Sequence, residues 1–305
     1  MLKTQMMQKA GIVTQQLAQD IIGMELGERV PTVEELATRY SAARGTVQQA
    51  IGRLREFGAL QLESHGHLGT NIVNINYSKL MEICGSEYLV GVMPLPYSRR
   101  YEGLATGIYS VLNDNTGVSV NFAFMGGSDR RLRSLLDGRY HFAVMSYVTA
   151  CHYLEQKNPI EISHVMGVHT YVNAHTLIMR SDFEGEPRRI GVDRSSFDQM
   201  SMTANYFQNK QIELVPLKYG HIIDNIKNRT IDATIWSLEE GILGDMELQH
   251  KPISGFGKTE DNTKAAIVVK RADVTVRNYL RRFFDVERVE QLQQEVLENQ
   301  LLPNY

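Results

Sequence analysis

The first quarter of the chain repeats apolar positions with a helical period. Residues 11–30 place four apolar side chains on one face of a predicted helix: Val13, Leu17, Ile21 and Met24. A second helix is predicted to begin after Pro31, because Thr32 and Glu35 have the three-residue spacing of a capping box. A third helix carries the apolar stripe Val47, Ala50, Ile51 and Leu54. Gly58 is predicted to end this third helix, since glycine adopts the left-handed conformation at low cost.

Two short strands are predicted after the third helix, at residues 60–63 and 71–75, around a turn that holds Gly66 and Gly69. Helices followed by a β-hairpin in this order are typical of a winged helix. In such a domain the third helix enters the major groove of DNA and the hairpin lies on the backbone. Residues 1–76 are therefore predicted to form a winged-helix DNA-binding domain.

This segment resembles the DNA-binding domain of GntR-type bacterial regulators. The resemblance rests on residues whose family spacing is kept: Val30-Pro31-Thr32, Leu36-Ala37, Arg44-Gly45-Thr46-Val47, Ala50, Leu54, Gly58-Ala59-Leu60 and Gly69-Thr70. The chain departs from the family pattern at three positions. Glu34 and Gln48 stand where the family usually has arginines, and Ala43 stands where a capping serine is usual.

The predicted DNA contacts follow from the chemistry of these side chains. The guanidinium of Arg44 can donate two parallel hydrogen bonds to a guanine. The side-chain amide of Gln48 or Gln49 can pair with an adenine. The residues expected to contact the phosphate backbone or to line the approach to it are Thr32, Gly45, Thr46, Gly69 and Thr70. The alternative is a purely structural helical cap with a solvated face.

The charge of residues 1–76 limits how tightly one copy can bind DNA. The segment holds seven Lys or Arg and seven Asp or Glu, so it is formally neutral. Phosphate contacts supply most non-specific affinity, and a neutral domain makes few of them. We expect weak binding by one copy and a dependence on a homodimer.

The rest of the chain alternates apolar, β-branched runs with helical patterns. The runs are "YLVGVMP", "VSVNFAFMGG", "HFAVMS", "HVMGVHT", "TLIMR", "RRIGVD", "IELVPL", "IDATIW" and "AAIVVKR". Such alternation predicts an α/β fold with covered sheets. The predicted organisation is a linker at 77–87 and a two-lobed domain at 88–305, with lobe one at about 88–180 and 265–305 and lobe two at about 181–264.

A weak internal repeat supports two lobes. "LLDGRYHFAVMS" and "IKNRTIDATIWS" each run from a helix end through a turn into a buried strand. This pattern resembles the type 2 periplasmic-binding-protein fold, in which a glycine-x-x-aspartate-alanine sequence commonly precedes a strand. The first copy has Gly138 without the aspartate, and the second has Asp232-Ala233 with Arg229 in place of glycine. With a GntR-like head, the whole chain resembles the YhfZ group of proposed enterobacterial regulators.

The resemblance to a two-lobed binding fold implies a ligand between the lobes, beside the carboxyl ends of strands. The predicted ligand-binding residues are Tyr97, Ser98, Arg99, Gly127, Ser128, Ser146, Tyr147, Arg194, Ser195, Ser196 and Trp236. Ser195 and Ser196 open a predicted helix whose N–H groups suit a carboxylate or phosphate, and Arg194 or the Arg99-Arg100 pair adds a cation. Each of these residues also has a purely structural interpretation. Serines before helices usually cap them, and a tryptophan at the end of an apolar strand is usually part of the hydrophobic core.

Composition narrows the function classes. A net charge of −3 argues against coating nucleic acid by charge alone, and two cysteines exclude a disulfide framework. No segment has the pattern of a signal peptide or a transmembrane helix, which predicts a cytoplasmic protein. No nucleophile elbow, P-loop or zinc-protease histidine pair is present, and the histidines are scattered. We therefore expect no enzyme activity, no cofactor and no metal.

The sequence thus predicts a ligand-responsive transcription regulator. A dimeric winged helix binds double-stranded DNA, and a two-lobed domain closes on a small anionic metabolite. The alternative is a solute-binding or enzymatic protein whose head no longer binds DNA, which Glu34 and the neutral head favour.

Overall fold

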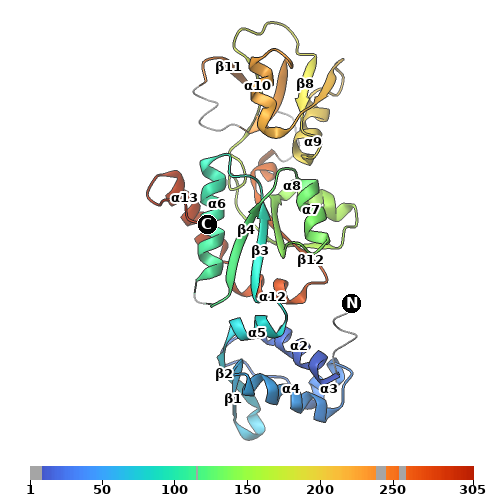
Figure 1. Cartoon of the computed structure of the whole chain (residues 1–305), viewed down its shortest axis with the longest axis vertical. Helices are drawn as coiled ribbons and strands as arrows, with labels where there is room; N and C mark the ends of the chain where they lie inside the picture. The colour runs from blue at the N-terminus through green and yellow to red at the C-terminus, as the bar shows by residue number, and fades with distance from the viewer. Residues whose placement is uncertain (1–8, 115, 238–244, 254–258) are drawn as a thin grey trace. The chain divides into compact units, whose positions relative to one another are not determined.

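The computed structural model describes residues 9–114, 116–237, 245–253 and 259–305 (Figure 1). The chain forms two compact units. Unit 1 holds the chain up to Leu89 together with Val111–Asn121 and Asp273–Phe284, and unit 2 holds Val90–Ser110, Phe122–Ala272 and Asp285–Tyr305.

Unit 1 contains a winged helix built from three helices and a hairpin. Its elements are α2 (Lys9–Ile22), α3 (Val33–Arg39), α4 (Arg44–Glu56), β1 (Leu60–Ser64) and β2 (Thr70–Ile75). The predicted capping box is confirmed, because the Thr32 side chain accepts from the Glu35 N–H while the Glu35 carboxylate accepts from the Thr32 N–H. Gly58 follows α4 with φ +64°, as its terminating role requires.

Two further helices pack on α2 and complete unit 1. They are α5 (Tyr77–Ile83), which occupies most of the segment predicted as a linker, and α12 (Val274–Phe283). Two hydrogen bonds join α2 to α12, from the Gln19 side chain to the Thr275 hydroxyl (3.0 Å) and from the Asn278 side chain to the Gln19 carbonyl (2.8 Å). Leu80 and Met81 of α5 are fully buried. The head therefore shares one core with a helix from near the end of the chain.

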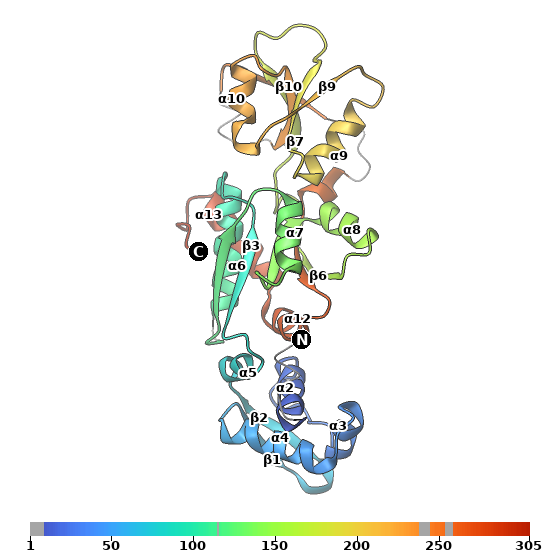
Figure 2. The same ribbon diagram turned by 45° about the vertical axis from the view of Figure 1, so that its right-hand side comes forward.

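The first sheet, most of whose residues belong to unit 2, has the order β4-β3-β5-β12-β6. Its strands are β3 (Tyr88–Met93), β4 (Ser119–Phe124), β5 (Phe142–Ser146), β6 (Ile160–Val165) and β12 (Ala265–Lys270). Strand β3 runs parallel to β5, whereas β12 is antiparallel to both β5 and β6. Helices α7 (Ser128–Leu136) and α8 (Tyr147–Glu155) lie on one side of this sheet, and α6 (Arg99–Asn113) and α13 (Val286–Leu297) on the other (Figures 1 and 2).

The second sheet of unit 2 has the order β11-β7-β10-β8-β9, with α9 (Phe197–Tyr206) and α10 (Ile222–Lys227) packed against it. Its strands are β7 (His175–Arg180), β8 (Arg189–Val192), β9 (Glu213–Pro216), β10 (Ala233–Ser237) and β11 (Leu248–Pro252). The predicted boundary near residue 180 assigned β7 to lobe one, but β7 pairs with β10 and β11 in lobe two. The apolar centre of β7, residues 177–179, fits either sheet, so its hydrophobic pattern carries no information on its partner.

The internal repeat occupies equivalent places in the two lobes. One copy leads from α7 through Gly138 (φ +77°) into β5, and the other from α10 through Arg229 (φ +62°) into β10. The Asp232 carboxylate accepts from the N–H groups of Arg188 and Arg189 and so ties the start of β10 to β8. A left-handed residue before the buried strand is therefore kept in both lobes, by glycine in one and arginine in the other.

Candidate functional site

Helix α4 presents a polar face to solvent in unit 1. Val47, Ala50 and Leu54 are fully buried against the rest of the head. The predicted base-reading residues, Arg44, Gln48 and Gln49, lie on the opposite, exposed face, where Gly45 is exposed as well. The structure therefore places the side chains with donor and acceptor groups suited to base edges together on one accessible surface.

Arg44 forms a salt bridge with Glu34 of α3, in which the guanidinium donates to the carboxylate. Both side chains are about two-thirds exposed (67% and 71%). A pair this exposed contributes less than about 1 kcal/mol, so Arg44 is free to exchange partners. Glu34 nonetheless places a negative charge on the predicted DNA-reading surface.

Two of the residues predicted to contact phosphates also have structural roles. The hydroxyl of Thr32 caps α3. Gly69, in the turn between β1 and β2, has φ +102°, and a Cβ there would lie 2.4 Å from the Nε atom of Arg29. Glycine is thus required by the backbone and by the close approach of Arg29, whether or not the turn contacts DNA.

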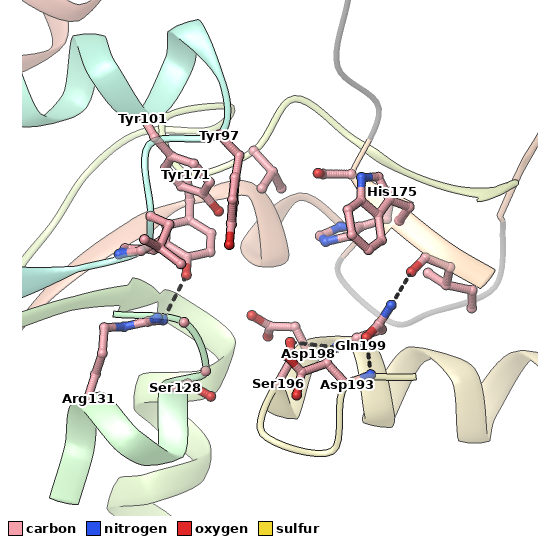
Figure 3. A pocket seen from close by; sticks show the side chains of 18 residues that line it. Tyr97, Tyr101, Ser128, Arg131, Tyr171, His175, Asp193, Ser196, Asp198 and Gln199 are labelled. Atoms are coloured by element: carbon pink, nitrogen blue, oxygen red, sulfur yellow. Dashed lines mark hydrogen bonds between the residues drawn. The ribbon is translucent and has the colours of Figure 1, made fainter. Parts of the chain in front are cut away.

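Unit 2 contains a cavity of about 80 Å³ between its two lobes (Figure 3). Five of the predicted ligand-binding residues line it: Tyr97, Gly127, Ser128, Ser196 and Trp236. At Gly127 the lobes approach so closely that a Cβ would lie 2.3 Å from the hydroxyl of Ser195. The cavity is therefore formed jointly by residues that follow strands of both sheets.

The other six predicted residues do not line this cavity: Ser98, Arg99, Ser146, Tyr147, Arg194 and Ser195. The Arg99 guanidinium donates to the Val296 carbonyl and the Asn299 side chain near the end of the chain. Arg194 is exposed and lines a separate pocket with His152. These cations therefore contact protein or solvent. The expectation that ligands bind beside the carboxyl ends of strands predicts which loops surround the site, but it does not predict the direction in which each side chain of a loop points.

Arg131 is the cation of the cavity, and the sequence reasoning missed it. It lies in the first turn and a half of α7, one of three arginines in the run "SDRRLRSLL". Arg130 and Arg133 are exposed, whereas Arg131 is 3% exposed on the same face as Leu135. Arg131 lies four positions before the core residue Leu135, and residues at this spacing share one face of a helix. A charged residue on a buried face is unusual, and this pattern would have identified Arg131 from the sequence.

The guanidinium of Arg131 is only partly satisfied. Nη1 donates to the Met125 carbonyl at 2.8 Å, and Nη2 donates to the Tyr171 hydroxyl at 3.1 Å. Its Nε is buried without a hydrogen-bond partner. No carboxylate of the described part of the chain lies within 4.0 Å of it. Burying a cation without a counter-ion is costly, so this charge favours an anion, which the described part of the chain does not supply.

The opposite wall is held rigidly by Gln199 of α9. Its side-chain oxygen accepts from the Asp193 N–H at 2.7 Å, and its NH₂ group donates to the Thr234 hydroxyl and the Ile235 carbonyl. The Asp193 carboxylate in turn accepts from the N–H and hydroxyl of Ser195. The loop after β8 is thereby fixed to β10, with Asp193 and Ser196 against the cavity.

Asp198 of α9 connects lobe two to lobe one. One of its carboxylate oxygens, Oδ1, accepts from the Ser146 hydroxyl at 2.8 Å and from the Thr149 hydroxyl at 2.9 Å, both at the start of α8. Burial raises the pKa of Asp198, and these hydroxyls and the charge of Arg131 oppose the rise. Beside it, the rings of His152 and Phe197 stack with centroids 3.7 Å apart. Residues of both lobes thus meet at the mouth of the cavity.

The remaining lining residues are aromatic or neutral. Burial lowers the pKa of His175 to about 4, so its imidazole is neutral at pH 7. Burial also raises the pKa of the Tyr171 phenol, which stays protonated and accepts from Arg131. Among the described residues, the ionic groups of the lining are therefore one guanidinium, Arg131, and two carboxylates, Asp193 and Asp198.

The described residues also bear on metal and membrane binding. Within the described ranges, no three His, Cys, Asp or Glu side chains are grouped so as to hold a metal ion. Over the same ranges, no helix combines the length and apolar character that crossing a bilayer requires.

Two family descriptions match the chain. Residues 76–305 match the YhfZ C-terminal domain, and residues 25–72 match a helix-turn-helix domain. The YhfZ protein of Escherichia coli (strain K12) is 32% identical over 298 residues, which are 97% of this chain and 98% of that protein. The match to the helix-turn-helix description covers α3, α4 and the first half of the predicted wing.

Two solved structures support the predicted fold class. The crystal structure of YhfZ from Shigella flexneri is 34% identical, with a TM-score of 0.61 over 72% of this chain and 93% of that one. The alkanesulfonate-binding protein SsuA from Xanthomonas axonopodis pv. citri, bound to MOPS, is 11% identical, with a TM-score of 0.53 over 70% of this chain and 75% of that one. The prediction of an α/β body with a periplasmic-binding-protein-like fold is confirmed.

Proposed function

Because this chain belongs to the YhfZ family and joins a helix-turn-helix domain to a two-lobed binding fold, we propose that it is a ligand-responsive transcription regulator. A GntR-like winged helix binds operator DNA as a homodimer in the cytoplasm. A small molecule with an anionic group enters the cavity of unit 2 and changes the affinity for DNA. The observation that carries the proposal is the buried guanidinium of Arg131, whose Nε has no hydrogen-bond partner and which has no counter-ion among the described residues, in a cavity lined by both lobes.

A covalent route for coupling exists in the chain. Strand β12 ends at Lys270 in the first sheet of unit 2, and α12 begins at Val274, three residues after Arg271. Helix α12 then packs on α2 of the head through Gln19, Asn278 and the ion pair between Arg282 and Glu25. A ligand that binds one lobe arrangement more tightly than another shifts the arrangement, and this connection is available to transmit the shift.

DNA binding is tested by a gel shift of the purified protein against its own upstream region at low salt. We expect a shift that random DNA of equal length does not compete away. Arg44→Ala is expected to weaken the preference for that region by about tenfold or more, because a bidentate arginine contact contributes about 1–3 kcal/mol of discrimination. Arg130→Ala, an exposed arginine of α7 in unit 2, is the matched control and should bind as the wild type does. Equal affinity for upstream and random DNA would contradict the proposal.

A second candidate function is a solute-binding or enzymatic protein whose head no longer binds DNA. The salt bridge between Glu34 and Arg44 favours it, since the carboxylate neutralises the predicted base-reading side chain. The gel shift separates the two functions, because this candidate predicts no preference even for the Glu34→Gln variant, in which Arg44 is released.

A further inference from the structure

We propose that the cavity of unit 2 binds a free amino acid, with its carboxylate on Arg131 and its ammonium group facing Asp198 and Asp193. The inference rests on the proposed function in taking this cavity as the effector site. It goes beyond it by naming a ligand that carries both charges. A simple anion fits the lining less well, because one wall of the cavity carries a cation and the opposite wall carries two carboxylates.

The first wall requires an oxyanion. Arg131 is buried, its Nε has no partner, and its two other nitrogens donate to a backbone carbonyl and to the neutral phenol of Tyr171. None of these partners carries a negative charge. A planar carboxylate accepts from a guanidinium in the geometry that arginine favours, and such a pair is stronger than a neutral hydrogen bond.

The second wall requires a cation. Asp198 uses Oδ1 for the Ser146 and Thr149 hydroxyls, and within the described residues Oδ2 has no hydrogen-bond partner although the side chain lines the cavity. Asp193 lines the same wall. Figure 3 shows the Arg131 guanidinium on one side of the cavity and Asp193 and Asp198 on the other. A ligand with only negative charge would gain Arg131 but would face two carboxylates.

Arg131 and Asp198 influence each other without forming an ion pair. The charge of Arg131 opposes the rise in the pKa of Asp198, so the two groups are close enough to interact. No salt bridge joins Arg131 to Asp198 among the described residues, and Figure 3 shows the two on opposite sides of the cavity. The space between them is therefore suited to a small molecule that carries the two complementary charges itself.

The aromatic lining agrees with a ligand of this kind. Tyr97, Tyr101 and Trp236 contribute ring surface to the cavity. Aromatic faces attract cations as well as apolar side chains, so they accommodate an ammonium group or the side chain of an amino acid. A cavity of about 80 Å³ also restricts the ligand to a small metabolite in the arrangement described.

The test uses Trp236, the only tryptophan in the sequence, as a reporter inside the site. The full-length protein is titrated with each of the twenty common L-amino acids while tryptophan fluorescence is recorded, and hits are confirmed by calorimetry. Each hit is then compared with two matched analogues, the acid that lacks the amino group and the amide that lacks the carboxylate. We expect at least one amino acid to bind and both of its analogues to bind at least tenfold more weakly.

Variants assign the two charges to their partners. Arg131→Gln and Asp198→Asn are each expected to weaken the amino acid by about tenfold or more, and Arg131→Lys to restore part of the affinity because it keeps the charge without the planar fork. Arg130→Gln and Asp224→Asn, which change exposed residues, should bind as the wild type does. Circular dichroism of each variant identifies any that fail to fold, and Arg131→Lys then carries the comparison.

The outcomes separate this inference from the proposed function. Binding of the deaminated acid as tightly as the amino acid, or no response to any of the twenty, overturns the inference while leaving a regulator with another effector. Binding of an amino acid that leaves DNA affinity unchanged supports the inference and contradicts the proposed regulation. Equal binding by Arg131→Gln and wild type would show that the site lies elsewhere and would overturn the inference.

Discussion

The hydroxyl of Ser146, at the start of α8 in lobe one, donates a 2.8 Å hydrogen bond to the carboxylate of Asp198, on α9 of lobe two. The same carboxylate oxygen accepts from Thr149. This aspartate thus joins the two lobes of unit 2 beside the cavity, together with a hydrogen bond from the Phe197 N–H to the Ser128 hydroxyl (3.4 Å). The side chain that makes the lobe contact also lines the cavity proposed to bind the ligand.

Ser146→Ala is expected to loosen this contact. It removes one hydrogen bond to a charged group, which contributes about 1.5–3 kcal/mol, and also the cap of α8. Hydrogen–deuterium exchange should therefore increase in both α8 and α9. Asp285→Ala is the matched control, since it removes only the cap of α13. Faster exchange confined to α8 would show that the bond to Asp198 does not hold the lobes.

His175 is expected to make stability depend on pH. Its pKa is about 4 in the folded protein and about 6.5 when unfolded, so the unfolded chain binds the proton more readily. The contribution of the neutral imidazole is complete above pH 6.5 and is lost as the pH falls toward 4, by about 3 kcal/mol. Urea unfolding from pH 7.5 to 4.5 measures this. His175→Gln should flatten the profile over that interval, whereas His65→Gln, an exposed wing residue, should leave the slope unchanged.

Glu34→Gln is expected to strengthen DNA binding several-fold. It releases Arg44 from its salt bridge and removes a negative charge from the DNA-reading surface. Glu34→Arg should add a phosphate contact and steepen the dependence of log affinity on log salt concentration by about 0.9. Fluorescence anisotropy across a salt series measures both effects. Glu82→Gln, on α5, controls for net charge alone, and an equal gain there would contradict the local explanation.

Gly107→Ala is expected to destabilise the protein although alanine is the better helix former. A Cβ at this position of α6 would lie 2.6 Å from the Val289 carbonyl of α13. Overpacking of this kind costs about 1–3 kcal/mol and outweighs the gain in helix propensity. Gly52→Ala, in α4 with open space around it, should instead raise the melting temperature. Thermal unfolding compares the two variants. Equal changes in melting temperature would show that α6 and α13 move apart at little cost in free energy.

The sequence predicted the head more completely than the binding site. The capping box of Thr32 and Glu35, the end of α4 at Gly58 and both wing strands follow from local spacing, which acts within a few residues. Local rules also located the loops around the cavity, and five residues on them line it. These features need no knowledge of what packs against them.

The missed residues depend on contacts that are distant in the sequence. Arg131 and Asp198 lie within helices and not at strand ends, and only the meeting of the two lobes turns them toward one cavity. Arg99 has the predicted charge and lies in the predicted loop, yet Val296 of α13 and Asn299 just after that helix, about 200 residues later, accept its hydrogen bonds. The sheet to which β7 belongs is likewise decided by its pairing with β10.

The central claim is that a ligand at Arg131 controls the affinity of the head for DNA. Its most direct test is the anisotropy of labelled upstream DNA titrated with the full-length protein, with and without a saturating amino acid identified by Trp236 fluorescence. The account predicts that the amino acid changes the dissociation constant about fivefold or more, in the range usual for coupled sites. It also predicts that Arg131→Gln, with unchanged DNA affinity in the absence of ligand, loses this response. An identical dissociation constant with and without the bound amino acid would contradict the account.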